Sequence, residues 1–547
     1  MAKYDRERVI QVLEQLQGCY QYLKDTPRTN AYKKAVMALK GYSGSLRGIG
    51  NYTFLSGVGK GISDKICEIL ETGTSAKLQE LEVLCPPPSI VEFQKLRGVG
   101  PVAARNLWRT YGATNLKQLQ KLADKGKVAD KDLLEALAFL AKERERIPLG
   151  VALPLVESIV GVLSPITGYL TKPAGSIRRM RDTVGDIDIL TTLPVADAIK
   201  YLRRQFDITK VMAEGEKKAH IFFGEPHNLQ IDIIHSEEDD FGAALLYLTG
   251  SRDFNIAMRI IAIKRGWSLS QYGLKSKIGG KPYHTSDEFK VFQKLGLVWV
   301  PPELREDAFY LDRDNEIPKL IEEATIDYHT HTSWSDGKLT VDEMVRLGIR
   351  DNLHHIGISD HSQSLKIAHG LTPERLGEQA AVIRKYRREY SDHIDIFHGS
   401  EVDINSDGSL DYPDEVLQQL DYVIAAIHMR PEKDVEQRLL KAISNPYTTI
   451  IAHPAGREFG RRSIAAINWD KVFRAAAEHH VAMEINCQPT RMDLPVDLIK
   501  HARQLGVKFA IGTDIHGGSR EHVKFGLANA RKAGLTKKDL LRLKPVG

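Results

Sequence analysis

Seven short apolar runs in the C-terminal part of the chain constrain its fold more than any other feature. Most are separated by stretches with helical spacing, and almost every run ends in His, Asp or Glu. Alternation of strand and helix is typical of a parallel barrel, in which the carboxyl ends of the strands form the active face. The runs lie at residues 325–329, 355–360, 394–398, 423–428, 449–453, 481–486 and 508–514.

Histidine is concentrated in the same region, since 15 of the 19 histidines lie beyond residue 325. One histidine at a strand end is more often structural than a ligand. A whole ring of imidazoles and carboxylates cannot be buried without partners, however, and metal is the simplest partner. Such a mixture suits Zn²⁺, Mn²⁺ or Fe²⁺. The expected ligands, enough for three ions with Glu401 as a bridge, are His329, His331, Asp336, His361, Glu401, His428, His453, Asp514 and His516.

A second group of acidic residues lies earlier in the chain. Asp186 and Asp188, in an extended run, project from one face of a strand because side chains alternate with a period of two. Asp232 lies on the apolar run at 229–234 and joins them if the two strands pair. Three such carboxylates repel one another unless divalent cations lie between them, and oxygen ligands suit Mg²⁺ or Mn²⁺. Two ions are the usual arrangement for phosphoryl transfer, so the pattern indicates nucleotidyl transfer.

A glycine–serine pair and three arginines strengthen this interpretation. Gly175 and Ser176 precede the aspartates, and a glycine allows the backbone to approach a phosphate. Arg178, Arg179 and Arg181 supply positive charge to neutralise it. Asp-x-Asp alone is more often the solvated edge of a strand, but the combination in this order favours the metal site.

Residues 55–66 and 96–107 form two related segments, each with a helix, a Gly-apolar-Gly turn and a second helix. Glycines let the backbone reach a phosphate, and the start of the second helix adds partial positive charge. Ordinary helix–helix turns are the alternative, but two copies with basic neighbours favour contact with a DNA backbone. The expected DNA contacts are Gly57, Gly59, Lys60, Gly98, Gly100 and Arg105.

Length and composition indicate a multidomain globular protein. A chain of 547 residues exceeds the roughly 250–300 residues of a single core. The net charge of +5 fits nucleic acid only weakly, so local clusters must carry that argument. Four scattered cysteines indicate thiols in a reducing compartment. No apolar run approaches the roughly 18 residues of a membrane span, so we expect no membrane contact and a cytoplasmic location.

The acidic motifs resemble those of a known family. Residues 175–188 resemble the palm motif of family X DNA polymerases, the polymerase beta relatives, and residues 247–259 resemble their thumb segment. The resemblance implies that Asp186, Asp188 and Asp232 hold two Mg²⁺ or Mn²⁺ ions. It implies triphosphate contacts from Gly175, Ser176, Arg179 and Gly185, sugar contacts from Tyr247 and Gly250, and a base-edge contact from Asn255.

The C-terminal region resembles the polymerase and histidinol phosphatase (PHP) domain, a distorted seven-stranded barrel. The resemblance rests on His329-Thr-His-Thr, Ser359-Asp-His-Ser, Ile451-Ala-His-Pro and Gly512-Thr-Asp-Ile-His. All nine positions that bind metals in active members are filled, so a working phosphoesterase is expected. Its ions would generate a metal-bound hydroxide near neutral pH. Arg430 and Arg457 are expected to grip phosphate.

The N-terminal segments resemble helix-hairpin-helix motifs. In polymerase beta relatives the first domain also removes a deoxyribose phosphate through a Schiff-base lysine. Lys65 matches that lysine, and Asn30-Ala31-Tyr32 resembles a segment beside it. Because a lysine on a DNA-facing helix is more often a phosphate contact, lyase activity is a hypothesis.

Two features depart from the vertebrate repair enzymes of this family. Leu248 replaces an aromatic residue, which leaves sugar discrimination open. Gln230 and Ile234 replace basic residues, so we expect positive charge to be missing near Asp232 and closure of the site to be controlled differently.

Together the resemblances imply a bacterial or archaeal family X DNA polymerase with a C-terminal PHP domain, a multidomain α+β and α/β fold. The expected domains are a helical N-terminal domain with a helix-hairpin-helix (1–85), fingers with a second one (86–149), palm (150–242), thumb (243–315), linker (316–324) and barrel (325–547).

The function that the resemblance implies is gap filling in DNA repair by a monomer that uses dNTPs and gapped or primer–template DNA. It also implies association with the nucleoid of a prokaryote. The barrel would supply a 3′–5′ exonuclease, with abasic-site endonuclease or 3′-phosphatase action as further activities. The alternatives are a PHP phosphoesterase with a weak or idle polymerase, a nucleotidyltransferase for RNA or small molecules, and a DNA-binding scaffold with idle sites. Histidinol phosphate is disfavoured as a substrate by the DNA-gripping hairpins.

Overall fold

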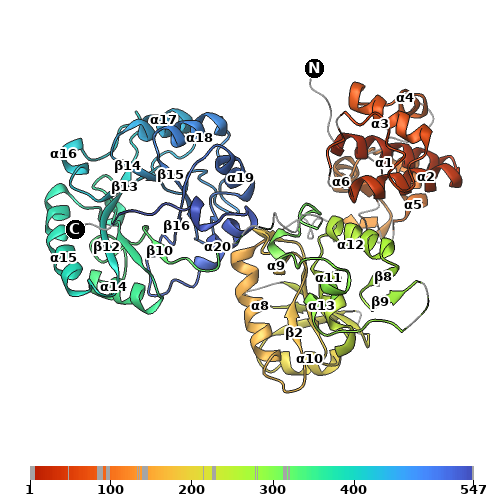
Figure 1. The fold of residues 1–547 in the computed structure, drawn as a ribbon, viewed down its shortest axis with the longest axis horizontal. Coiled ribbons are helices and arrows are strands. Elements are labelled where there is room, and N and C mark those ends of the chain that lie inside the picture. Colours follow the sequence, from red (N-terminus) through yellow and green to blue (C-terminus); the bar gives the residue numbers. More distant parts are fainter. Residues whose placement is uncertain are drawn as a thin grey trace.

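A computed structural model describes a helical N-terminal part, a mixed sheet with its helices, and a parallel barrel, which follow one another along the chain (Figure 1). The described residues are 6–42, 44–46, 48–82, 90, 92–93, 96, 99–131, 133–134, 136–137, 146–212, 215–224, 229–277, 279, 281–311, 317, 319 and 321–544. The predicted boundary at residues 85–86 lies outside them, and the domain limits stay predictions.

The N-terminal part consists of helices around two apolar cores. Val9, Leu13 and Leu16 lie at helical spacing on α1 and are fully buried, so they hold α1 in the first core. The side chain of Asp25 caps α2 by accepting a hydrogen bond from the Arg28 amide. The first core contains α1 (Arg6–Tyr22), α2 (Thr26–Lys40), α3 (Lys60–Thr72) and α4 (Ala76–Glu82), and the second contains α5 (Pro101–Tyr111) and α6 (Leu116–Asp124).

A five-stranded sheet lies at the centre of the next part, in the order β2-β4-β7-β6-β5. β4 and β7 run parallel, and the other neighbours are antiparallel. The strands are β2 (Thr171–Pro173), β4 (Ile187–Thr191), β5 (Ile208–Met212), β6 (Lys218–Phe223) and β7 (Gln230–His235). They share a core with α8 (Leu149–Leu163) and α10 (Val195–Leu202), and the short helix α9 (Gly175–Arg178) and the pair β1 (Ile147–Pro148) and β3 (Thr183–Val184) complete this part.

The segment after the sheet is helical and is joined to it by buried ion pairs. Glu288 is 5% exposed and forms ion pairs with Arg178 next to the sheet and with Arg305. Burial would raise the pKa of Glu288, but Arg305 and Arg178 outweigh burial and lower it to about 2. The elements are η2 (Glu238–Asp240), α11 (Phe241–Thr249), α12 (Arg252–Lys264), β8 (Trp267–Ser270), β9 (Gly273–Ser276), α13 (Glu288–Lys294) and η3 (Pro302–Leu304).

The C-terminal part is the predicted barrel of seven parallel strands, in sequence order. A bridge between Thr330 and Ile515 joins the two ends of the sheet, and the Asp514 amide donates to the His329 carbonyl at 2.8 Å. The strands are β10 (Ile326–Asp327), β11 (His355–Ile358), β12 (Asp395–Asp403), β13 (Tyr422–Ala426), β14 (Thr448–Ile451), β15 (Ala482–Asn486) and β16 (Phe509–Gly512).

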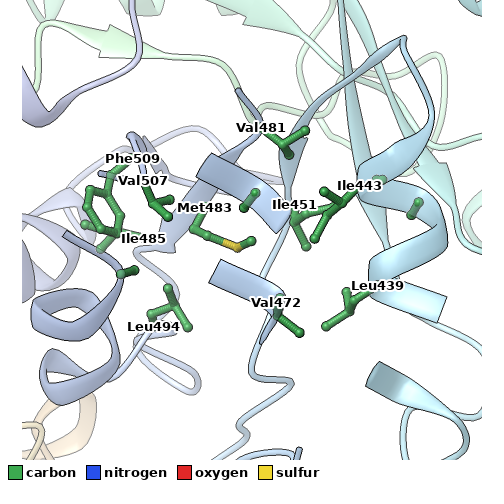
Figure 2. Close-up of a cluster of buried hydrophobic side chains, with 14 of the residues drawn as sticks. Leu439, Ile443, Ile451, Val472, Val481, Met483, Ile485, Leu494, Val507 and Phe509 are labelled. Carbon is green, nitrogen blue, oxygen red and sulfur yellow. The ribbon is translucent and has the colours of Figure 1, made fainter. Parts of the chain in front are cut away.

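Helices surround the barrel and bury apolar side chains against its strands. Figure 2 shows one such region, where Leu439 and Ile443 of α17 approach Ile451 of β14, and Met483 and Ile485 of β15 lie near Leu494. The helices and short turns are α14 (Val341–Arg350), η5 (Lys366–Ala368), α15 (Pro373–Glu389), α16 (Asp414–Leu417), α17 (Val435–Ser444), α18 (Trp469–Glu478), α19 (Val496–Gln504), α20 (Val523–Lys532) and η6 (Lys537–Asp539).

Within the described part of the chain, none of the helices combines the length and the apolar character that a membrane crossing requires.

Two candidate metal centres

The first centre is built on the paired strands β4 and β7. Asp188 and Asp232 are register partners on these parallel strands, so both side chains project from the same face of the sheet, and Asp186 directly precedes β4. The strand pairing on which the three-carboxylate site depended is therefore confirmed. Burial and the charges of Asp186 and Asp232 raise the pKa of Asp188 to about 7. The cluster is thus poised to bind cations, because full ionisation at neutral pH requires positive charge between the carboxylates.

Gly175 and Ser176 cover this cluster. Gly175 has φ +63°, and a Cβ at this position would lie 2.7 Å from Oδ2 of Asp188, so only glycine fits. The Ala174 amide donates to the Asp188 carbonyl at 2.8 Å, which fixes the turn against β4. The Ser176 hydroxyl is buried and has no hydrogen-bond partner among the described residues. A buried polar atom left unpaired on the residue after Gly175 fits a bound polar group such as a metal-coordinated phosphate.

Arg179 contacts the segment that carries the predicted sugar and base contacts. Its guanidinium donates to Glu306 at 2.9 Å and to the Thr249 carbonyl, and a Cβ on Gly250 would lie 3.2 Å from its Nη1. Asn255 donates to the Tyr247 carbonyl at 2.6 Å. The end of α11 and the start of α12 therefore lie against the glycine–serine turn.

The other residues of this turn are placed differently. Arg178 is bound to buried Glu288 and therefore holds the fold together, whereas Arg181 pairs with Glu306 at 3.0 Å. Gly185 is exposed directly before Asp186, and only Nη1 of Arg146 would approach a Cβ there, at 3.6 Å.

The expectation that positive charge is missing near Asp232 is wrong. Strand β6 places Lys218 Nζ 2.7 Å and His220 Nδ1 2.6 Å from the Asp232 carboxylate. Burial would raise the pKa of Asp232, but hydrogen bonds from Lys218, Gln230 and His220 outweigh it and lower the pKa. These residues were missed because they lie on a neighbouring strand; the alternation Lys218-Ala219-His220 on a strand antiparallel to β7 was the available signal.

The first Gly-apolar-Gly turn packs closely on α2. A Cβ on Gly57, which has φ +87°, would lie 2.9 Å from the Cβ of Lys34. Gly59 is the N-cap of α3 and faces open space, as the approach of a phosphate requires, and Lys60, the first residue of α3, is exposed beside it. A cavity of about 450 Å³ beside this turn is lined by residues that include Asn30, Ala31, Lys34, Gly57 and Gly59.

Lys65 lies on α3, half-buried, with its Nζ 3.4 Å from the Gly61 carbonyl. It does not line the cavity beside Asn30 and Ala31. Lyase chemistry therefore stays a prediction.

The second turn is described only in part. Gly100 is the N-cap of α5 and faces open space, whereas Gly98 lies outside the described residues. The guanidinium of Arg105 lies over the Tyr22 ring, 5.4 Å from its centroid, so this predicted DNA contact is also packed against α1.

The second centre lies at the carboxyl ends of the barrel strands, with Glu401 at its middle. Imidazole nitrogens of five histidines lie within 3.5 Å of the Glu401 carboxylate, from 2.8 Å for His361 to 3.5 Å for His331. Asp336 and Asp514 lie 3.3 Å from His516 and His331, respectively. All nine predicted ligands are therefore brought together: His329, His331, Asp336, His361, Glu401, His428, His453, Asp514 and His516.

Three groups of these donors have the spacing of a metal site. Within each group the ligand atoms lie within 4.8 Å of one another. Buried donor atoms of His329, His331, His361 and Glu401 lack hydrogen-bond partners among the described residues. Burial and the neighbouring His361 and His516 lower the pKa of His331 to about 3, so this imidazole is neutral, as a ligand must be. The donor set fits a cluster of divalent cations. The groups are His331, Asp336, His361 and His516; His329, His331 and Glu401; and His361, Glu401 and His428.

A further layer of carboxylates orients the ligands. Glu484 of β15 binds Nδ1 of His329 at 2.5 Å and accepts from the His453 amide at 2.6 Å. Asp403 binds Nδ1 of His428 at 2.8 Å. Fixing one ring nitrogen leaves the other directed at the centre. Neither role was predicted; the available signals were the position of Glu484 within the apolar run at 481–486 and that of Asp403 two residues after Glu401.

Two ligands of this centre have a backbone conformation that favours glycine. His453 has φ +28° and Asp514 has φ +52°, a region that residues other than glycine rarely adopt. Such conformations cluster at functional sites, where the surrounding structure fixes them.

The two arginines expected to grip phosphate are placed differently from each other. Arg430 is exposed two residues after His428, and its guanidinium has no ion-pair partner among the described residues. Arg457 is 8% exposed and donates to Asp182 at 2.7 Å and to the Arg491 carbonyl at 2.8 Å. Its donors are used within the protein, so we no longer expect Arg457 to bind phosphate.

Three family models match parts of the chain. The family model of the helix-hairpin-helix domain matches residues 5–75, that of the DNA polymerase beta thumb matches residues 244–306, and that of the PHP domain matches residues 327–488.

Three relatives are similar to this chain over different shares of its length. The chain is 35% identical over 555 residues to DNA polymerase/3′-5′ exonuclease PolX of Bacillus subtilis (strain 168), covering 98% of this chain and 97% of that protein. It is 28% identical over 327 residues to DNA polymerase lambda of Rattus norvegicus, covering 54% of this chain and 56% of that protein. It is 32% identical over 205 residues to a probable phosphatase of Thermoanaerobacter sp. (strain X514), covering 35% of this chain and 78% of that protein. The chain therefore belongs to the family X DNA polymerases that carry a C-terminal PHP domain.

Proposed function

We propose that this protein fills gaps in DNA during repair and that its barrel degrades DNA ends from 3′ to 5′. The observation that carries the proposal is the presence of two separate carboxylate-containing centres, one on β4 and β7 and one in the barrel. The similarity to the Bacillus subtilis polymerase/exonuclease extends over nearly the whole of this chain, which supports assigning both activities to this protein.

In the polymerase reaction Asp186, Asp188 and Asp232 would hold two Mg²⁺ or Mn²⁺ ions. Bound ions supply charge neutralisation to the triphosphate and lower the pKa of the attacking 3′-hydroxyl. The unpaired Ser176 hydroxyl and the backbone at Gly175 would contact phosphate oxygens. Arg179 would exchange Glu306 for the triphosphate, because both are anionic partners for the same guanidinium. Tyr247, Gly250 and Asn255 would approach the sugar and base, and Gly185 the triphosphate.

In the barrel the nine ligands would hold three ions, with Mn²⁺, Zn²⁺ and Fe²⁺ as the candidates. Bound ions polarise a phosphodiester and activate water at neutral pH. Glu484 and Asp403 would hold the rings of His329 and His428 in register. Arg430 would bind a DNA phosphate, either that of the released nucleotide or that of the next one in the strand. Its guanidinium follows the ligand His428 closely in the sequence and has no ion-pair partner among the described residues.

The same proposal covers the partners. Gapped or primer–template DNA would lie against the two glycine turns, with Gly59, Lys60 and Gly100 at the phosphates. The protein would act as a monomer on dNTPs, associated with the nucleoid. Abasic-site endonuclease, 3′-phosphatase and Lys65-dependent lyase activities are further proposals for the same substrate.

The test uses a labelled gapped duplex with a 5′-phosphate in Mg²⁺ or Mn²⁺, with and without dNTPs. Asp186→Ala is expected to abolish extension and leave 3′ degradation intact, whereas Glu401→Ala should do the reverse. Absence of extension by the wild type on any gapped duplex would reduce the protein to a phosphoesterase with an idle polymerase part.

A further inference from the structure

We propose that Lys532 and Arg457 of the barrel are positioning residues of the polymerase site, because they hold the end of the loop that would bind the triphosphate. The inference rests on the proposed polymerase function and adds that the barrel is a structural part of the nucleotide site. The loop is defined as residues 175–182; it begins with the short helix α9 and ends at Asp182.

Lys532, the last residue of α20, holds the loop by its backbone. Its Nζ donates to the Met180 carbonyl at 2.6 Å, and the side chain is buried, with 7% exposed. Met180 follows Arg179 directly and has φ +53°. A methionine rarely adopts this conformation and needs support from its surroundings. The barrel supplies that support next to the arginine expected to bind the triphosphate.

Arg457 holds the same loop by a side chain. Its Nη1 lies 2.7 Å from Oδ2 of Asp182, while its other nitrogens bind the Arg491 and Met492 carbonyls of the barrel. Burial would raise the pKa of Asp182, but Lys532 and Arg457 outweigh it and lower the pKa. Asp182 is therefore ionised, and its ion pair with Arg457 holds it against the barrel.

The end of α20 also reaches the other side of the expected triphosphate site. Arg531, next to Lys532, donates to Glu303 of η3 at 2.9 Å. The turn that follows η3 carries Glu306, the partner of Arg179 and Arg181. One helix end thus contacts both the loop and the segment that holds its arginines.

The contact between barrel and sheet is tightly packed, so the barrel can hold residues 175–182 in place. Met492 and Phe525 of the barrel lie in the apolar core of the sheet. Gly150 at the start of α8 lies against Pro489, where a Cβ would lie 2.3 Å from the proline Cβ. Figure 1 shows α20 at this junction, next to α8 and α9.

Lys532→Met removes the donor of the hydrogen bond to the Met180 carbonyl. Burial lowers the pKa of Lys532 to about 8, with Asp182 and Glu306 acting against that change and Arg457 and Arg181 adding to it. Because the variant leaves the Met180 carbonyl without this donor and Asp182 with one cation fewer, it is also expected to lose some stability. The effect on the loop is therefore measured by KM for dNTP, and the 3′ degradation rate reports whether the rest of the protein stays folded.

The experiment compares Lys532→Met with Lys524→Met in the full-length protein. Lys524 lies on the same helix and also joins barrel to sheet, through Glu157 at 2.6 Å, but contacts α8 rather than the loop. For each protein, KM for dNTP and kcat are measured in single-nucleotide gap filling. The 3′ degradation rate and the thermal unfolding midpoint are measured alongside.

Lys532→Met should raise KM for dNTP about tenfold, the effect of losing one charge-assisted hydrogen bond, with kcat nearly unchanged. Its 3′ degradation rate should stay at the wild-type value although its unfolding midpoint falls, because the Met180 carbonyl loses its donor. Lys524→Met should match the wild type in KM, kcat and 3′ degradation rate. If Lys532→Met has the wild-type KM for dNTP, this inference is wrong, but the proposed function is unaffected. A rise in KM of the same size in Lys524→Met would also overturn the inference, whereas absence of wild-type extension would overturn the proposed function itself.

Discussion

At the scale of single residues, the first metal centre depends on the absence of a Cβ atom at Gly175. Gly175 has a left-handed backbone and lies where a Cβ would meet the Asp188 carboxylate at 2.7 Å. Space and conformation both require glycine here, so the turn can lie directly over the carboxylates and its backbone can meet a phosphate.

Gly175→Ala is expected to lower gap-filling activity at least about a hundredfold, because the methyl group displaces Asp188, and misplaced reacting groups cost this much. Gly168→Ala is the matched control. Gly168 also has positive φ, +84°, but nothing lies within 4 Å of its Cβ position. Primer extension rates of the two variants make the comparison, and equal losses in both would show that backbone strain alone matters.

Asp188 gives the metal-free protein a pH-dependent stability. Its pKa is about 7 in the folded protein and near the ordinary 3.8 when unfolded. Between these values the folded state binds more protons, so the free energy of unfolding falls as pH rises from about 4 to 7.

Asp188→Asn should therefore stabilise the metal-free protein by about 1–3 kcal/mol at pH 8 and by much less at pH 5, where Asp188 is already neutral. Urea unfolding in EDTA at the two pH values measures this difference. A gain that is the same at both pH values would contradict the raised pKa of Asp188.

Sequence prediction succeeded for residues whose role follows from their own motif. Asp188 and Asp232 were placed together because each strand was recognisable alone and parallel pairing aligns them. Lys218 and His220 were not predicted, since their contact with Asp232 depends on the register of β6 with β7. A single sequence does not fix the register between separate strands.

At the scale of elements, the barrel strands carry the second centre. All the ligands except Asp336 lie within four residues of a strand end, so the repeated apolar runs ending in His, Asp or Glu indicated where the centre lies. Asp336 lies in the segment between β10 and α14. Asp403 and Glu484 have the same local pattern as the ligands, but the structure uses them to hold His428 and His329. The two roles differ only in how far the side chain lies from the middle of the centre, which the local sequence does not show.

Glu484→Gln should weaken metal binding in the barrel by about 10–100-fold, because the His329 ring loses its charged partner. The 3′ degradation rate should fall at limiting Mn²⁺ and recover at high Mn²⁺, with extension unchanged. Glu478→Gln, an exposed glutamate at the end of α18, is the control. Loss of degradation that no Mn²⁺ concentration restores would mean that Glu484 acts in the reaction itself.

At the scale of the whole molecule, two chemistries share one tightly packed body. The sequence indicated both parts, yet their contact was not predictable. Lys532 and Met180 are separated by 352 residues, and Arg457 and Asp182 by 275. Arg457 even resembled a phosphate contact until the structure placed Asp182 against it, because a charged side chain does not reveal its partner.

The most direct measurement of the account follows both reactions on one labelled gapped duplex. Rates of extension and of 3′ degradation are compared for wild type, Asp232→Ala, His329→Ala and the double variant. The account predicts that Asp232→Ala loses only extension, His329→Ala loses only degradation, and the double variant loses both. Loss of both activities in a folded single variant would contradict the existence of two separate centres.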